Sequence, residues 1–234
     1  MNFYVFKNMT HFDNLLKMIP DLSQKRILDL GAGKGGFLLD LAGRGLKAVG
    51  IEYNPDYIDE ALRLANEKGL NIEIERGDGE SLPFGDSSFD FINMSEVFEH
   101  VHDPRKVMQE VSRTLSKGGE AYISIPNRYG LIDPHYHLVF INWMPRVVAE
   151  WIISLFGKNK DDSGCAGVQR LSDMHYRSYQ NAIKELNDYG FEVSDVREIK
   201  IQKIYSGIKL ILARFAYLFA SRVYFDSMHF LIKK

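Results

Sequence analysis

The stretch R-I-L-D-L-G-A-G-K-G-G, residues 26 to 36, decides how the chain around it folds. Ile27, Leu28 and Leu30 form a short apolar run that stops at a glycine cluster, a pattern typical of a buried parallel strand that turns sharply into a helix. Because glycine has no Cβ, its backbone can take positive φ and lie directly against a flat ligand. We therefore expect a small molecule to contact bare amide groups at this turn.

The glycine turn alone does not identify its ligand. Gly31, Gly33 and Gly36 also fit the G-x-G-x-x-G pattern of dinucleotide-binding folds. Glu52 ends the next apolar run about 20 residues further on, where a nucleotide site places a carboxylate on ribose hydroxyls. A nicotinamide-dependent oxidoreductase, and a turn that serves only strand–helix packing, both stay open at this point.

Composition bounds the class of protein. The 234 residues, 45% of them hydrophobic, suit one large α/β domain over residues 1–234. A net charge of -2 with dispersed Lys and Arg makes a nucleic-acid partner unlikely. Cys165 is the single cysteine, which excludes an internal disulfide and fits a reducing compartment. With no signal peptide in the first residues, we expect a cytoplasmic protein.

Strand and helix patterns alternate along most of the chain. Asn54 followed by Pro55, and Asp103 followed by Pro104, are typical of helix N-termini, and Gly69 stands where a helix would end. This alternation predicts a doubly wound α/β fold, a mostly parallel sheet with helices on both faces and a ligand at the carboxyl ends of its strands. The expected helices cover residues 10–19, 37–43, 55–68, 104–115 and 178–189, and the expected strands include 72–74, 121–125 and the closing M-H-F-L-I-K-K.

Two segments interrupt the alternation. Residues 127–177 are far too long for a strand–helix connection, so we predict a helical lid insertion over the site, with a helix from Pro145 to Phe156 and a polar loop from Gly157 to Gly167. Residues 203–224 form an apolar helical insertion before the last strand. This segment, with Trp143, Trp151 and neighbouring apolar residues, is either ordinary core or a surface for peripheral membrane contact, with Lys209, Arg214 and Arg222 near head groups.

The stretch from Gly77 to Val101, G-D-G-E-S-L-P-F-G-D-S-S-F-D-F-I-N-M-S-E-V-F-E-H-V, separates the alternatives for the ligand. Together with D-L-G-A-G-K-G, V-G-I-E and E-H-V-x-D-P, in order over residues 26 to 126, it resembles the class I S-adenosylmethionine-dependent methyltransferases. Within them it is similar to the type 11 group of ubiquinone and menaquinone biosynthesis enzymes. A nicotinamide-dependent oxidoreductase gives no account of the G-D-x-E-x-L-P-F segment.

The resemblance implies a Rossmann-like, seven-stranded sheet with an antiparallel last strand, and S-adenosylmethionine as cofactor with S-adenosylhomocysteine as product. Asp78 is either the acceptor for the adenine amino group or a plain turn aspartate, and Leu82, Phe84 and Phe89 are either adenine contacts or core. The implied cofactor residues are Asp29, Gly31, Ala32, Gly33 and Gly35 for the methionine part, Glu52 and Tyr53 for the ribose, Asp78 and Gly79 for adenine, and Asn93 and Ser95 at the entrance.

The acceptor is less well defined by the sequence. The motif N-P-P-[YF], used for exocyclic amines, is absent after the fourth strand, and Cys165 lacks the preceding proline of a cytosine carbon-5 nucleophile. We expect transfer to an oxygen of a small-molecule or lipid-like acceptor, because the chemistry then requires alignment and one proton transfer. The alternatives are an acceptor in RNA or protein, and a partner or binding subunit without activity. The oligomeric state stays open.

Histidines are the candidate catalytic residues: His100, His135, His137 and His175. If Glu96, Glu99 and His100 occupy one helical turn, their side chains share a face and resemble the ligand set of metal-assisted O-methyltransferases. His175 is then the expected fourth ligand of Mg²⁺ or another divalent cation, ahead of His135 or His137. The alternative is that His100 acts as a metal-free base or positioning group.

Overall fold

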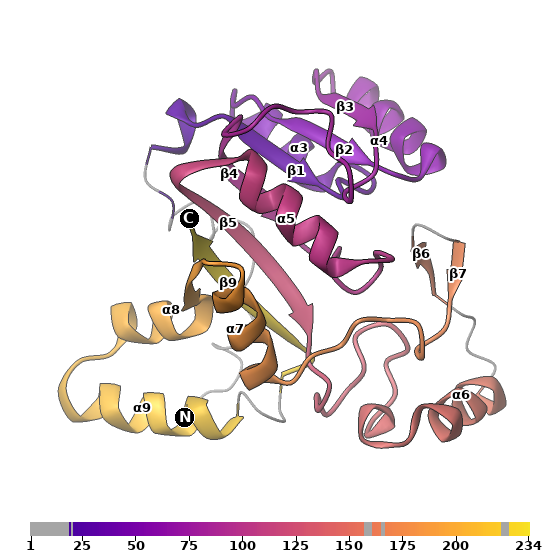
Figure 1. Cartoon of the computed structure of the whole chain (residues 1–234), viewed down its shortest axis with the longest axis vertical. Coiled ribbons are helices and arrows are strands. Elements are labelled where there is room, and N and C mark those ends of the chain that lie inside the picture. The colour runs from indigo at the N-terminus through magenta and orange to yellow at the C-terminus, as the bar shows by residue number, and fades with distance from the viewer. Residues whose placement is uncertain (1–18, 20, 157–160, 165–166, 221–224) are drawn as a thin grey trace.

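The computed structural model describes residues 19, 21–156, 161–164, 167–220 and 225–234 (Figure 1). The helix expected over residues 10–19 lies almost entirely outside them. Seven strands form one sheet in the order β3-β2-β1-β4-β5-β9-β8, and β9 runs antiparallel to both of its neighbours. The predicted mostly parallel sheet with an antiparallel last strand is confirmed. The strands are β1 (Ile27–Leu30), β2 (Val49–Glu52), β3 (Glu73–Arg76), β4 (Phe89–Met94), β5 (Leu115–Pro126), β8 (Glu192–Asp195) and β9 (Ser227–Lys233).

Helices cover both faces of this sheet because its strands are apolar on both sides. Leu28 and Ile92 pack in one core with Val107 and Leu186 from helices α5 and α7. Their strand neighbours turn to the opposite face, where a second core holds Leu41 of α3 and Val196 of α8. The helices around the sheet are η2 (Leu22–Gln24), α3 (Gly36–Gly43), α4 (Pro55–Glu67), α5 (Pro104–Thr114), α7 (Tyr179–Asp188), α8 (Val196–Ile204) and α9 (Gly207–Ala220).

The predicted helix starts are confirmed. The Asn54 side chain accepts a hydrogen bond from the Asp56 N–H, and Asp103 does the same for Arg105. Because the strand order reverses between β1 and β4, their carboxyl ends leave a crevice where the glycine turn lies.

One strand boundary and one whole helix differ from the sequence-based expectation. Strand β5 begins at Leu115, directly after α5, and not at residue 121, because Leu115 pairs with Phe89 before the register shifts. Helix α8 was not expected. It forms because the Asp195 carboxylate caps the N–H groups of Arg197 and Glu198, whereas the alternation of Ile199, Lys200 and Ile201 hides its helical period.

The two interruptions of the α/β alternation lie at one end of the molecule in Figure 1, below the sheet. Residues 127–177 contain η3 (Ile141–Trp143), the expected helix as α6 (Arg146–Leu155), and a small two-stranded sheet of β6 (Asp161–Gly164) and β7 (Gly167–Gln169) within the predicted polar loop. The segment from 203 includes the end of α8 and then α9. Among the described residues, no helix is long and apolar enough to span a bilayer.

Candidate active site

A cavity of about 350 Å³ opens at the carboxyl ends of β1, β2 and β4. Its position is the topological switch point of the sheet, where ligands of open α/β folds bind. The glycine turn, the end of β2 and the chain after β4 form its walls. The lining residues are Asp29, Leu30, Gly31, Ala32, Gly33, Phe37, Ile51, Glu52, Tyr53, Tyr57, Gly77, Gly79, Asn93, Ser95, Glu96, Val97, His100 and Val101.

Gly31, Gly33 and Gly35 of the turn all have positive φ, but a Cβ added to each would meet different surroundings. A Cβ on Gly31 would lie 2.3 Å from Val97 Cγ2, so Gly31 lets the chain after β4 pack against the turn. A Cβ on Gly35 would lie 2.9 Å from the Ala61 Cβ of α4, and Gly35 does not line the cavity. At Gly33 a Cβ would meet nothing within 4 Å. Gly33 is therefore the turn residue whose bare backbone leaves room for a ligand.

Glu52 holds the turn against β2. Its carboxylate accepts hydrogen bonds from the N–H groups of Gly33 and Asn54, each at 2.8 Å. The side chain is buried but lines the cavity, and each oxygen has a second lone pair. The carboxylate can thus accept further hydrogen bonds from a ligand while its geometry is fixed by the backbone.

Asp29 lies at the floor of the cavity, fully buried between strands. Its Oδ1 accepts a 2.7 Å hydrogen bond from Asn93 Nδ2. Burial raises the pKa of Asp29 to about 7, although the Asn93 hydrogen bond opposes the rise, and nearby Glu52 adds to it. A cationic ligand would favour the ionised carboxylate.

The loop between β3 and β4 closes the cavity with Gly77 and Gly79. Between them, Asp78 is exposed, is absent from the lining, and caps its own turn by accepting from the Glu80 N–H at 2.9 Å. Leu82 and Phe89 are buried in the core, as the alternative reading of these residues expected, and Phe84 packs against them. None of the three lines the cavity, which favours the core reading over the adenine-contact reading.

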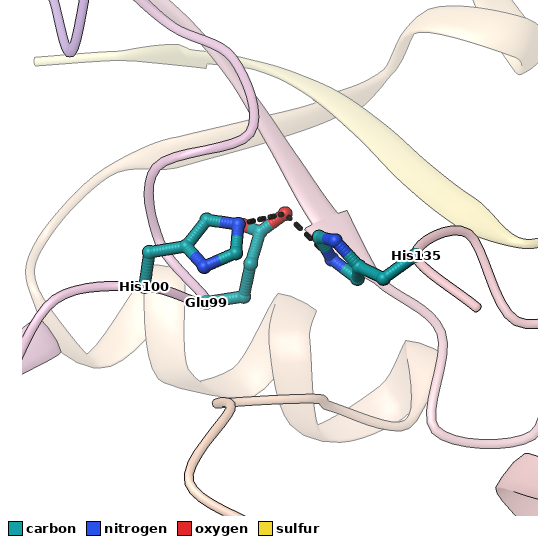
Figure 2. A group of neighbouring side chains, drawn as sticks. All are labelled: Glu99, His100 and His135. Carbon is teal, nitrogen blue, oxygen red and sulfur yellow. Dashed lines mark ion pairs between the residues drawn. The ribbon is translucent and has the colours of Figure 1, made fainter. Parts of the chain in front are cut away.

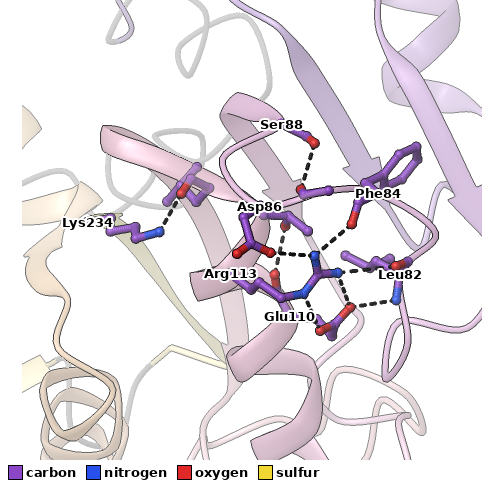
Figure 3. Close-up of polar contacts among 10 residues, drawn as sticks. Leu82, Phe84, Asp86, Ser88, Glu110, Arg113 and Lys234 are labelled. Carbon is purple, nitrogen blue, oxygen red and sulfur yellow. Dashed lines mark hydrogen bonds and ion pairs between the residues drawn. The ribbon is translucent and has the colours of Figure 1, made fainter.

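Arg113 of α5 fixes this loop from behind (Figure 3). Its guanidinium donates to the carbonyl oxygens of Phe84 at 2.7 Å and Leu82 at 3.2 Å, and to Asp86 at 3.0 Å. Glu110 receives two more of its hydrogen bonds and itself accepts from the Leu82 N–H at 2.7 Å. The sequence analysis did not single out this pair, which positions one wall of the cavity.

A buried polar cluster of Glu99, His100 and His135 borders the cavity, because His100 is one of the lining residues (Figure 2). Glu99 Oε1 lies 4.0 Å from His100 Nε2 and 3.7 Å from His135 Nε2, with the two imidazoles on either side of the carboxylate. Glu99 Oε2 is buried and accepts no hydrogen bond from the described residues. One ligand atom from each of the three side chains falls within a common 4.8 Å.

The structure corrects the expected geometry of this cluster. Residues 96–100 form a turn and not a helical turn, with Glu96 at φ 58 and the His100 N–H bonded to the Val97 carbonyl, so the shared-face argument was wrong. The His175 backbone lies beside Glu99, since its N–H donates to the Glu99 carbonyl at 3.1 Å, but its Nε2 lies 3.0 Å from the Val101 carbonyl and outside the cluster, and His137 is exposed. His135 takes the expected place of His175.

Glu96 lines the cavity beside the cluster. Loss of water around its carboxyl raises its pKa, and the charge of Glu99 adds to the rise, while His135 and His100 oppose it. Seven cavity residues escaped the sequence analysis as site residues: Leu30, Phe37, Ile51, Tyr57, Gly77, Val97 and Val101. Except for Gly77, their helical and apolar spacing fitted core positions equally well.

Comparisons with known proteins agree with this geometry. Residues 28–123 match the family model described as Methyltransferase domain. The chain is 33% identical over 169 residues to the ubiquinone biosynthesis O-methyltransferase of Coxiella burnetii (strain RSA 331), covering 68% of this chain and 71% of that one. It is 32% identical over 131 residues to the demethylmenaquinone methyltransferase of Deinococcus radiodurans, covering 54% of each.

The chain spans only about half of the length of the first curated relatives that it matches. Among solved structures, an S-adenosylmethionine-dependent methyltransferase of Mesorhizobium loti aligns with a TM-score of 0.61 at 18% identity, over 98% of this chain and 100% of that chain. At this identity the alignment supports the fold alone.

Proposed function

The chain belongs to the class I S-adenosylmethionine-dependent methyltransferases, and we propose that it transfers a methyl group to an oxygen of a small-molecule or lipid-like acceptor. One observation carries the proposal: the cavity at the switch point joins an open glycine turn to a buried, backbone-held carboxylate and to a histidine. When bound, S-adenosylmethionine supplies a methyl group on a sulfonium, a carbon already activated for displacement.

The residues present fit this cofactor. Gly33 leaves open space where any side chain would intrude, and Glu52 keeps free lone pairs for ribose hydroxyls. The proposal that Asp29 recognises the cationic methionine part is supported by its place in the cavity lining, and Asn93, proposed for the entrance, also holds the Asp29 carboxylate by a hydrogen bond. Asp78, Gly79, Tyr53 and Ser95 keep their proposed roles, although Asp78 would have to turn from Glu80 to reach adenine.

An oxygen acceptor is supported by the cluster next to the cavity. A hydroxyl must lose a proton as it gains a methyl group, and His100 both lines the cavity and lies beside Glu99. We propose that His100 takes this proton and that Glu99 stabilises the resulting imidazolium. The name of the Coxiella burnetii relative specifies transfer to oxygen and gives the same direction.

A second role of the same cluster is cation binding. Glu99, His100 and His135 bring carboxylate and imidazole ligand atoms within 4.8 Å, and the buried Glu99 Oε2 lacks a hydrogen-bond partner among the described residues. These donors fit Mg²⁺ poorly and Mn²⁺ or Zn²⁺ better, because imidazole favours the transition metals. In this role the three residues would hold the ion, whereas Glu96, which lines the cavity, is not part of this ligand group.

Titration calorimetry with S-adenosylmethionine, S-adenosylhomocysteine and NADH tests the cofactor. We expect the first two to bind and NADH not to bind. Gly33→Val should abolish binding, because its side chain enters the cavity. The matched control is Gly69→Val, since Gly69 also has positive φ and open space around its Cβ but lies at the end of α4. Equal affinity in folded Gly33→Val and wild type would refute the assignment.

Transfer of a labelled methyl group to fractionated extracts tests the acceptor. We expect label in the small-molecule or lipid fraction and its loss in His100→Ala. Label in RNA or protein would overturn the acceptor class. Cofactor binding without transfer to any fraction would favour a binding subunit without activity.

A further inference from the structure

Helix α9 has two apolar faces, and among the described residues only one of them packs in a core. Ala213, Tyr217 and Ala220 pack with Ile201 and Phe225 in a small separate core. Successive helical residues are roughly 100° apart, so these three form one narrow stripe. The opposite side of the helix exposes large apolar side chains, up to 75% for Phe215 and 78% for Phe219. The full set on this outer face is Ile208, Ile211, Leu212, Phe215, Leu218 and Phe219.

The charged residues of α9 are cations, and one of them, Arg214, is ion-paired with Glu198 of α8. Lys209 and Arg214 are the charged residues of α9, and they lie on its two flanks, between the covered stripe and the outer face. The sequence has no acidic residue between Glu198 and Asp226, while it has five cations there: Lys200, Lys203, Lys209, Arg214 and Arg222. An apolar face flanked by cations complements a surface that is apolar inside and anionic outside.

Helix α6 also has one covered and one exposed apolar face, although its two charged residues, Arg146 and Glu150, have opposite signs. Ala149 and Ile153 are buried in the core of the 127–177 segment, whereas Val147, Trp151 and Leu155 point outward at a spacing of four residues. Trp151 is 61% exposed, and Phe156, the residue that ends the helix, is 67% exposed. Figure 1 shows α6 and α9 at the same end of the molecule, remote from β1, β2 and β3. Two separate apolar faces therefore lie at one end.

We propose that α6 and α9 dock this protein on the surface of an anionic lipid bilayer. The 14 residues of α9 extend roughly 21 Å, shorter than the hydrocarbon core, so the helix lies in the interface and does not cross it. A second copy is a poorer occupant. Two-fold packing through the α9 face would bring Lys209 of each copy towards its equivalent without any acidic residue in α9 to neutralise it, whereas Arg214 is already paired with Glu198.

Vesicle flotation of the full-length chain tests the proposal, which does not depend on the methyl-transfer reaction. We expect binding to phosphatidylcholine vesicles that contain a quarter phosphatidylglycerol, much weaker binding to phosphatidylcholine alone, and a loss of binding as salt is raised. Phe215→Ser with Phe219→Ser should weaken binding at least tenfold, and Lys209→Glu should weaken it on anionic vesicles only. The control is Leu62→Ser, which replaces an exposed apolar side chain of α4 and should bind vesicles as the wild type does.

Tryptophan fluorescence tests the contact of α6 with the bilayer independently of α9, because both tryptophans of the chain, Trp143 and Trp151, lie in or near α6. In a Trp143→Phe background, the emission of Trp151 should shift to the blue when anionic vesicles are added. Calorimetry with S-adenosylhomocysteine should give the wild-type affinity in the Phe215 and Phe219 variant, since neither residue lines the cavity.

Three results would overturn the proposal. The first is no flotation with either vesicle. The second is flotation unchanged by the two serines, or Trp151 emission unchanged by vesicles, which removes α9 or α6 respectively from the surface. The third is a dimer in sedimentation velocity that the two serines dissociate, which would make α9 an interface between copies.

Discussion

Alanine at Gly31 and at Gly33 should separate packing from ligand binding, although the two glycines are two residues apart. Both have positive φ, +70° and +53°, so a Cβ costs about 1–2 kcal/mol at either position. At Gly31 the Cβ also lies 2.3 Å from Val97 Cγ2. Val97 is buried and β-branched, so it cannot rotate away easily, and such overpacking costs about 1–3 kcal/mol more.

Urea unfolding followed by circular dichroism measures the difference. We expect Gly33→Ala to lose about 1–2 kcal/mol and Gly31→Ala about 2–5 kcal/mol of unfolding free energy. Val97→Ala removes the overlapping methyl group and by itself costs roughly 2 kcal/mol. Because Val97→Ala also relieves the clash, the double variant Gly31→Ala with Val97→Ala should lose about 1–3 kcal/mol less unfolding free energy than the two single losses added together.

Two results would refute this reasoning. If Gly31→Ala is no less stable than Gly33→Ala, or if the Gly31 and Val97 losses simply add, the overlap does not exist in solution. Calorimetry supplies the second half of the comparison: Gly33→Ala, the more stable variant, should lose at least as much S-adenosylhomocysteine affinity as Gly31→Ala, because its methyl group points into open cavity space.

Three further outcomes follow from the polar groups. Arg113→Lys keeps the positive charge but loses the guanidinium that donates to Phe84, Leu82 and Asp86. We expect a loss of about 2 kcal/mol of stability, which lowers the melting temperature by roughly 5 °C, and weaker binding of S-adenosylhomocysteine. The control Arg105→Lys on the same helix should change neither quantity. The raised pKa of Asp29, about 7 against an unfolded value near 3.9, means that the folded state keeps a proton which the unfolded state loses, so this group's contribution to stability falls as pH rises from 4 to 7. Asp29→Asn should therefore gain on wild type over that range in urea unfolding, by up to about 4 kcal/mol, and a constant difference between the two would contradict the shift. Mn²⁺ titration by calorimetry should show binding that Glu99→Gln and His135→Ala abolish and that the exposed-histidine variant His102→Ala retains; wild type without Mn²⁺ binding would leave only the base role of His100.

The sequence could predict that the glycine turn, Glu52 and Asn93 line one cavity, because each position is defined by its own strand. The glycine turn directly follows β1, Glu52 and Asn93 lie at the carboxyl ends of β2 and β4, and parallel strands end at the same edge of the sheet. Their meeting therefore needed only the strand order. Helix ends were equally readable, since Asn54 and Asp103 act within two residues of their own position.

The polar cluster could not be predicted in the same way. Glu99 and His100 are neighbours, but their partner was chosen by assuming a helix where the chain forms a turn with Glu96 at positive φ. His135 comes from a loop inside the 127–177 segment, whose path no periodicity defines. Its position depends on Asp133, which is buried and accepts hydrogen bonds from the N–H groups of His135 and Tyr136 and from the Tyr176 hydroxyl.

This dependence links the acceptor side of the site to the end of the molecule with the exposed apolar helices. His135 is held by Asp133 and Tyr176, and Tyr176 shares its core with Ala149 and Ile153 of α6. The same segment thus places one histidine beside Glu99 and presents Val147 and Trp151 to the outside. A displacement of α6 would reach Glu99 through Tyr176 and Asp133, and it would leave the Glu52–Gly33 contact unaffected because β1 and β2 carry that contact alone. Substitutions in the α6 core should therefore alter the polar cluster before they alter cofactor affinity.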